Sequence, residues 1–195
     1  MDERLGQQIQ FAIEIDKLKG VLRQTLLADG SRQENSAEHS WHLAMMAMLL
    51  QEYAPKPVDL LRVIKMLLVH DLVEVYAGDT FCYDLQGNLD KAAREAEAAE
   101  KLFGILPALQ GLELRELWQE FEENATANAQ FATALDRLQP LLQNRETEGA
   151  TWKMHGINAA QVRDRMSPVQ EGIPALWPLV QQIIEEAMEK GYLKE

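Results

Sequence analysis

The apolar segment from Asp59 to Ala77 constrains the fold most, because it carries a histidine and an aspartate side by side among aliphatic residues. Asp59 is suited to cap the start of a helix and Gly78 to end it. Polar side chains in apolar surroundings are costly unless they are hydrogen-bonded, paired or bound to a metal. His70 and Asp71 therefore need partners, either a divalent ion or the capping and salt-bridging groups of an ordinary helical core. The apolar positions that predict a largely buried helix are 60, 61, 63, 64, 67, 68 and 72.

The composition is that of a soluble globular protein. The chain has 195 residues, of which 47% are hydrophobic, enough for one domain with a sizeable core. The 19 basic and 31 acidic residues give a formal net charge of −12, which opposes binding to a nucleic acid polymer. A small phosphorylated ligand remains compatible with this charge, because a few local cations and a metal ion can outweigh the global field.

The single cysteine and the absence of targeting patterns indicate where in the cell the protein is expected. Cys82 has no second cysteine to pair with, which favours a reducing environment. The N-terminus lacks a signal-peptide pattern, and no apolar run is long enough to span a bilayer. We therefore expect a cytoplasmic protein with no membrane partner.

Helical periodicity dominates the rest of the chain, and no β-alternation of useful length occurs. The sequence predicts one all-α domain over residues 1–195, a bundle of about seven or eight helices. Its functional core is expected at about 23–140, with the C-terminal helices of 157–191 packing on it. A kink is expected at Pro140 and a solvated helix at 89–103. Besides 59–77, the segments predicted to be helical are 3–22, 36–53, 89–103, 112–123, 127–148, 159–166 and 174–190.

Two other predicted helices also carry a polar side chain inside an apolar run. His39 lies in the helix of 36–53, and Asp136 lies in the helix of 127–148. Convergence of His39, His70, Asp71 and Asp136 around one metal ion would satisfy all four side chains. His42 is three residues after His39 on the same face and is expected to pack or to support a ligand.

The order of these residues resembles the HD-domain metal-dependent phosphohydrolases. The segment Glu34–Ser40 reads E-N-x-x-E-H-S, and His70–Asp79 reads H-D-x-x-E-x-x-x-G-D. Together with the later Asp136, these segments resemble the HD subgroup that contains the 5′-deoxynucleotidases. The resemblance extends over roughly residues 23–138.

This resemblance implies roles for individual residues. The metal ligands would be His39, His70, Asp71 and Asp136, holding one divalent ion: Mn, Co, Fe, Zn, Ni or Mg. A single ion is favoured because two-metal HD enzymes need further histidines, which residues 72–135 lack.

The resemblance also implies the residues that act on the substrate. Glu74 would be the general acid/base, and Asp79 would act in both substrate binding and chemistry. Arg23 would contact the phosphate, with Arg32 as a second candidate cation. Two departures from the subgroup bear on the substrate: Gln24 stands where some members have tryptophan, and the segment Phe81–Asp84 replaces a proline-containing loop.

The implied function is hydrolysis of (deoxy)nucleoside 5′-monophosphates by metal-activated water, in a protein that forms a homodimer. Two alternatives stay open on the residues alone. One is an HD hydrolase of another phosphate ester or pyrophosphate, such as guanosine tetraphosphate. The other is a non-catalytic module that binds metal or nucleotide. His155 and Cys82 are expected to be loop residues without a direct chemical role.

Overall fold

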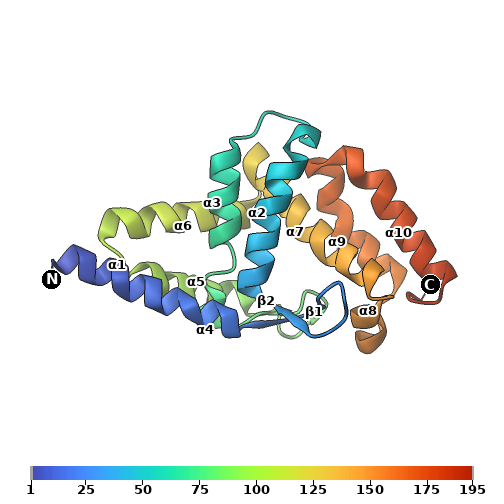
Figure 1. Ribbon diagram of the computed structural model, residues 1–195, viewed down its shortest axis with the longest axis horizontal. Helices are drawn as coiled ribbons and strands as arrows, with labels where there is room; N and C mark the ends of the chain where they lie inside the picture. Colours follow the sequence, from blue (N-terminus) through green and yellow to red (C-terminus); the bar gives the residue numbers. More distant parts are fainter. Residues whose placement is uncertain (1, 195) are drawn as a thin grey trace.

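The predicted helices form in a computed structural model that describes residues 2–194 (Figure 1). Eight helices in this range have ten residues or more, which confirms the all-α fold class. The α-helices are α1 Glu3–Glu14, α2 Ser36–Leu50, α3 Leu60–Val69, α4 Glu74–Ala77, α5 Lys91–Phe103, α6 Ala108–Glu123, α7 Ala127–Glu146, α8 Ala150–His155, α9 Ala159–Gly172 and α10 Trp177–Glu189. Three short 3₁₀ helices are η1 Ile15–Gly20, η2 Gln51–Tyr53 and η3 Pro174–Leu176.

Helix α7 is the centre of the core. It packs against α2 and α3 on one side, and against α6 and α9 elsewhere (Figure 1). Its side chains Phe131, Leu135, Leu138 and Leu141 are almost completely buried. A polar residue on this helix, such as Asp136, is therefore held rigidly against the neighbouring helices. Among residues 2–194, no helix is both long and apolar enough to cross a membrane.

The predicted continuous helix of 59–77 is wrong, because the chain turns between α3 and α4. Helix α3 ends at Val69, and the next backbone bonds are short i→i−3 bonds from Leu72 to Val69 and from Glu74 to Asp71. The imidazole Nδ1 of His70 donates to the carbonyl of Leu67 at 2.8 Å. The tight turn presents His70, Asp71 and Glu74 together at the end of α3.

A small antiparallel hairpin was not predicted from the sequence. Strand β1 (Leu22–Leu26) pairs with β2 (Gln33–Asn35), with an irregular register between them. Strands this short carry too few alternating residues to be recognised by periodicity. The hairpin lies against α7 and α8 and brings Arg23 and Glu34 beneath the start of α2.

Three further predictions differ from the structure. Helix α5 is solvated on one side only, because Ala98, Ala99, Leu102 and Phe103 are buried and the helix packs against α4 and α6. His155, expected to be a loop residue, is the last residue of α8. Helix α9 continues past Pro168 to Gly172, where the hydroxyl of Ser167 donates to the carbonyl of Asp164, the group that proline leaves unpaired.

Replacing Gly172 with alanine is expected to destabilise the fold, because α7 and α9 lie very close together at this position. A Cβ atom at this position would lie 2.2 Å from the Gln130 carbonyl oxygen and 2.6 Å from the Ala134 Cβ. Overpacking of this kind costs about 1–3 kcal/mol, so the melting temperature should fall by roughly 2–10 °C. Thermal unfolding followed by circular dichroism measures this change. Gly20→Ala is the control, since its Cβ would meet nothing within 4 Å; equal melting temperatures for the two variants would contradict the close approach.

Candidate functional site

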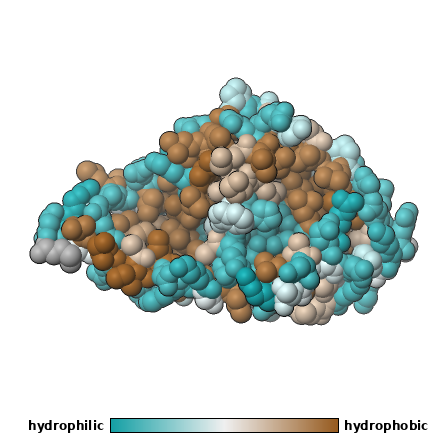
Figure 2. All heavy atoms as spheres, in the orientation of Figure 1, coloured by the Kyte–Doolittle hydropathy of each residue, from teal (hydrophilic) through white to brown (hydrophobic). Residues whose placement is uncertain are grey.

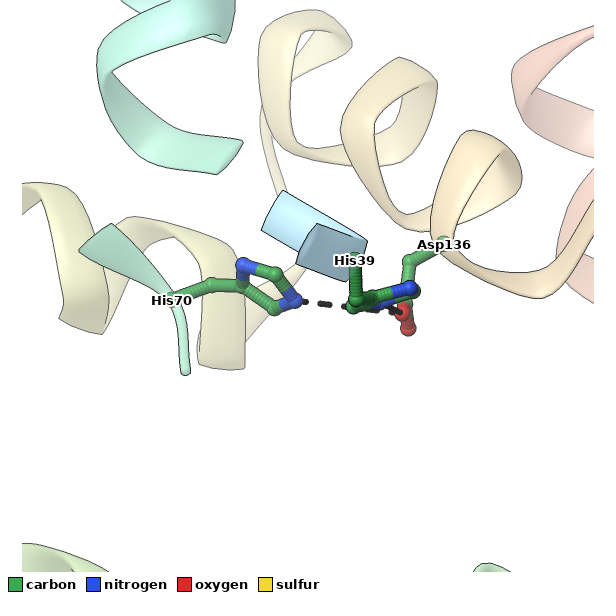
Figure 3. A group of neighbouring side chains, drawn as sticks. All are labelled: His39, His70 and Asp136. Atoms are coloured by element: carbon green, nitrogen blue, oxygen red, sulfur yellow. Dashed lines mark hydrogen bonds and ion pairs between the residues drawn. The ribbon is translucent and has the colours of Figure 1, made fainter. Parts of the chain in front are cut away.

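Three buried side chains from three helices converge at the inner end of α3 (Figure 3). His39 comes from α2, His70 caps the C-terminus of α3, and Asp136 comes from α7. One ligand atom from each lies within 4.8 Å of the others. The Asp136 Oδ1 atom is 2.9 Å from Nε2 of His39 and 3.8 Å from Nε2 of His70. The arrangement is a candidate metal centre.

The tautomer of His70 leaves a lone pair on Nε2, which faces this cluster. Its Nδ1 atom faces the Leu67 carbonyl, which can only accept, so Nδ1 carries the proton. The Nε2 atom is then a buried acceptor, and it has no hydrogen-bond partner among residues 2–194. A buried acceptor without a donor is costly, and a cation in the cluster would remove that cost.

His39 is fixed in the same way by a glutamine. The Gln139 amide donates through Nε2 to Glu34 at 2.8 Å, so its Oε1 faces Nδ1 of His39 at 3.0 Å. Nδ1 therefore donates, and the lone pair on Nε2 faces the Asp136 carboxylate. Two acceptors 2.9 Å apart require a cation between them, either a proton or a metal ion.

The charges at the cluster favour such a cation. Burial opposes ionisation of Asp136, but Arg137 and the two histidines outweigh it and hold the pKa of Asp136 well below its usual range. Burial and Arg23 disfavour a charged His39, yet bonds to Asp136 and Glu34 raise its pKa. Neutral imidazoles beside carboxylates are a donor set that suits divalent first-row metals.

Asp71, the fourth predicted ligand, lies beside these three. Its Oδ1 atom is 3.1 Å from Nε2 of His70, and its Oδ2 atom is 3.9 Å from Nε2 of His39. The same Oδ2 atom accepts a hydrogen bond from Nη1 of Arg23 at 3.0 Å. The structure therefore brings all four predicted ligands and Arg23 together.

Sequence reasoning missed the polar network behind His39. Glu34 is almost fully buried and accepts bonds from the amides of Gln139 and Gln143, both at 2.8 Å. The Gln139 amide nitrogen also lies 3.2 Å from Nδ1 of His42, so His42 supports the network as expected. The available signal was the position of Gln139 beside Leu138, Leu141 and Leu142, three residues after Asp136.

Glu74 and Asp79 border the cluster on its open side. The Glu74 Oε2 atom accepts a bond from the hydroxyl of Ser36 at 2.6 Å. Burial, followed by the charges of Asp71 and Asp79, raises the pKa of Glu74 well above its ordinary value. Burial likewise raises the pKa of Asp79. A carboxylate with a raised pKa is a stronger base than an ordinary one and is suited to accept and return a proton.

A cavity of about 320 Å³ opens from the cluster. Its volume falls at the lower end of the range typical for small-molecule sites. Cys82 borders it, and burial raises the pKa of that thiol. His155 lies behind the wall, with its ring centroid 4.4 Å from that of Phe81. Side chains from elements far apart in sequence line the cavity, among them Arg23, Asp71, Glu74, Asp79, Tyr83, Lys91, Asp136, Arg137, Asn144, Trp152 and Arg165.

The cations that line the cavity are not all those that the sequence predicted. Arg32 does not line the cavity: its guanidinium is exposed and forms two bonds to Glu38, at 2.6 and 2.9 Å. Lys91, Arg137 and Arg165 do line it, although sequence reasoning did not select them. Basic residues on amphipathic helices are common on solvated faces, so only the packing distinguishes these three.

Comparisons with known proteins identify a family and several similar proteins. The family model described as HD domain matches residues 15–177. The 5′-deoxynucleotidase HDDC2 of Homo sapiens is 32% identical over 141 residues, covering 72% of this chain and 68% of that protein. The 5′-deoxynucleotidase hdd1 of Schizosaccharomyces pombe is 25% identical over 189 residues, covering 89% of this chain and 94% of that protein.

A solved structure is similar over the whole chain. The crystal structure of a predicted metal-dependent phosphohydrolase from Magnetospirillum magnetotacticum MS-1 superposes with a TM-score of 0.95. The two sequences are 52% identical, and the alignment covers 100% of this chain and 97% of the other. The match to the family model spans most of the chain, and the resemblance noted in the sequence is confirmed. The chain belongs to the HD domain family.

Proposed function

We propose that the protein is a metal-dependent phosphohydrolase that releases phosphate from (deoxy)nucleoside 5′-monophosphates. One observation carries the proposal: the lone pairs of His39 and His70 face the ionised Asp136 at the inner end of a cavity that Glu74 also lines. The names of the similar proteins support a nucleotide as the substrate.

The metal site is proposed to hold one divalent ion. His39, His70, Asp71 and Asp136 would supply the ligands, and their chemistry accommodates Mn, Co, Fe, Zn, Ni or Mg. When bound, such an ion polarises the phosphoryl group and lowers the pKa of a coordinated water molecule.

The protein's own residues perform the proton transfers. Glu74 is held at Oε2 by Ser36, and its carboxylate accepts the proton of the attacking water. The same group then returns a proton to the departing 5′-oxygen. Arg23 keeps Asp71 in place through the 3.0 Å bond and adds positive charge to the cavity. Asp79 is proposed to contact the sugar.

The test is phosphate release from a panel of esters. Ribo- and deoxyribonucleoside 5′-monophosphates, guanosine tetraphosphate and a simple aryl phosphate would be incubated with the metal-supplied protein. Release from the monophosphates above all others supports the proposal, and the deoxy-to-ribo ratio gives the sugar preference. Preferential cleavage of guanosine tetraphosphate would contradict the proposal and indicate a pyrophosphohydrolase. If no ester released phosphate, the protein would instead be a non-catalytic binding module.

A homodimer is proposed on the basis of an exposed apolar face. Trp41, Met45, Met48 and Leu49 recur at helical spacing on α2 and are 38–68% exposed. Leu61 on α3 is also exposed, and hydrophobic residues gather over these helices in Figure 2. Monomeric proteins rarely expose contiguous apolar patches of this kind, and a second copy of the chain is the proposed occupant.

Leu49→Asp is expected to convert the dimer to a monomer, because the charge would be buried in an apolar contact. Light scattering coupled to gel filtration measures the mass of each species. Leu85→Asp is the matched control, since Leu85 is a leucine 80% exposed outside this face. A wild-type protein that elutes as a monomer at all concentrations would contradict the proposed dimer.

We also propose a cytoplasmic location, which a single reduced cysteine permits. Fractionation of cells that express the tagged chain tests it. Recovery in the membrane or secreted fraction would contradict the proposal.

A further inference from the structure

Among the described residues, three of the cations that line the cavity have a carboxylate partner, and one does not. Arg23 is paired with Asp71 at 3.0 Å, and Lys91 lies 3.5 Å from Glu95. Arg137 is paired with its neighbour Asp136. Arg165, which reaches the cavity from α9, has no carboxylate within 4.0 Å in the part of the chain that the structure describes. Its positive charge is therefore available to a ligand.

Arg165 lies near Arg137. Both side chains line the same cavity, Arg137 from α7 and Arg165 from α9, and these two helices pack against each other. Two guanidinium groups that share a half-buried cavity repel each other unless an anion lies between them. Six carboxylates and four cations line the cavity, so the two neighbouring guanidinium groups are a local feature of its wall and not part of a generally positive surface.

Arg137 links this pair to the metal cluster. It donates through Nη1 to Oδ2 of Asp136, while Oδ1 of the same carboxylate faces His39. The guanidinium is thus one carboxylate away from the proposed metal position. The hydroxyl of Thr133, one helical turn before Arg137 on α7, also borders the cavity and has no hydrogen-bond partner among residues 2–194.

We propose that Arg137 and Arg165 bind the substrate phosphate that lies against the metal centre. This proposal rests on the proposed function and adds two residues to it. Planar guanidinium groups bind phosphate oxygens through paired, charge-assisted hydrogen bonds. Arg165 would supply the free charge, and Arg137 would connect the phosphate to Asp136. Arg23, which is already paired with Asp71, then serves mainly to hold that ligand.

The position of the pair favours this phosphate over a second anionic group of the ligand. A subsite for a distant group would not need contact with a metal ligand, whereas Arg137 bonds directly to Asp136. The phosphate at the metal centre and a second anionic group of the ligand have the same oxyanion chemistry, so the experiment has to distinguish between them.

The test compares Arg165→Gln with Arg163→Gln in the metal-loaded protein. Arg163 lies two residues away on the same helix, is exposed and does not line the cavity. Inorganic phosphate is titrated by calorimetry, which requires no turnover. Loss of a charged hydrogen bond should raise the phosphate Kd of Arg165→Gln about tenfold or more, and leave Arg163→Gln at the wild-type value. Arg165→Lys should recover part of the affinity, because it keeps the charge but loses the planar fork.

Kinetics complete the test. The KM for nucleoside 5′-monophosphates should rise in Arg165→Gln in parallel with the phosphate Kd. An unchanged phosphate Kd overturns the proposal. So does a rise in KM confined to nucleoside 3′,5′-bisphosphates, which would place a second anionic group at Arg165. If no ester is hydrolysed but the phosphate Kd still rises in Arg165→Gln, the anion site stands and the nucleotidase proposal fails.

Discussion

Asp136→Asn is expected to abolish hydrolysis and to release the metal ion. The carboxylate of Asp136 faces both His39 and His70 from within the buried cluster, and the amide that replaces it carries no charge. Removal of a metal centre forfeits several kcal/mol of transition-state stabilisation, which corresponds to a rate loss of about 10³-fold or more. Phosphate release and metal content by mass spectrometry measure the two effects.

The substitution keeps the shape of the side chain, so the variant should fold. Asp16→Asn is the control, because Asp16 is exposed and pairs with Lys19 at the protein surface. A native melting curve for Asp136→Asn would show that the fold is retained. Full metal content together with wild-type activity in this variant would refute the assignment of the cluster.

Glu74→Gln is expected to lose activity while keeping the metal. Glu74 is not among the three clustered ligands, and its role is to move a proton between water and the leaving group. General acid–base catalysis contributes about 10²–10⁴-fold, so kcat should fall by that factor. The amide still accepts a bond from Ser36, and KM should therefore change little. Steady-state kinetics with a nucleoside monophosphate, together with metal analysis, separates this effect from that of Asp136→Asn.

The control for this variant is Glu97→Gln, an exposed glutamate on α5. It removes one negative charge from the protein without touching the cavity, so its kcat should equal that of the wild type. If Glu74→Gln retained kcat within a few-fold, a different group would have to accept the proton.

The metal cluster could be predicted because its residues are polar side chains within apolar segments. His39, His70 and Asp136 each interrupt an apolar helical run, and such interruptions are visible in a single sequence. Their order along the chain then matched a known family. The helical fold class followed from the same periodicity, which is strong in long amphipathic segments.

Other parts of the site depend on tertiary contacts that leave little trace in the sequence. The turn after Val69 arises from short i→i−3 bonds and the bond from His70 to Leu67, and the local apolar pattern continues through it. The hairpin that carries Arg23 and Glu34 is too short for periodicity to reveal. Arg165 looks like any basic residue on a surface helix until the cavity is known.

The most direct test is to restore activity to the chelator-treated protein with one metal at a time. Manganese, cobalt, iron, zinc, nickel or magnesium would be titrated while phosphate release from a deoxynucleoside 5′-monophosphate is followed. If the cluster is the catalytic centre, the metal-free protein is inactive, and activity saturates at one bound ion per chain. Hydrolysis that persists without metal, or its absence in a protein that holds one ion per chain, would contradict a metal-dependent phosphohydrolase at this site.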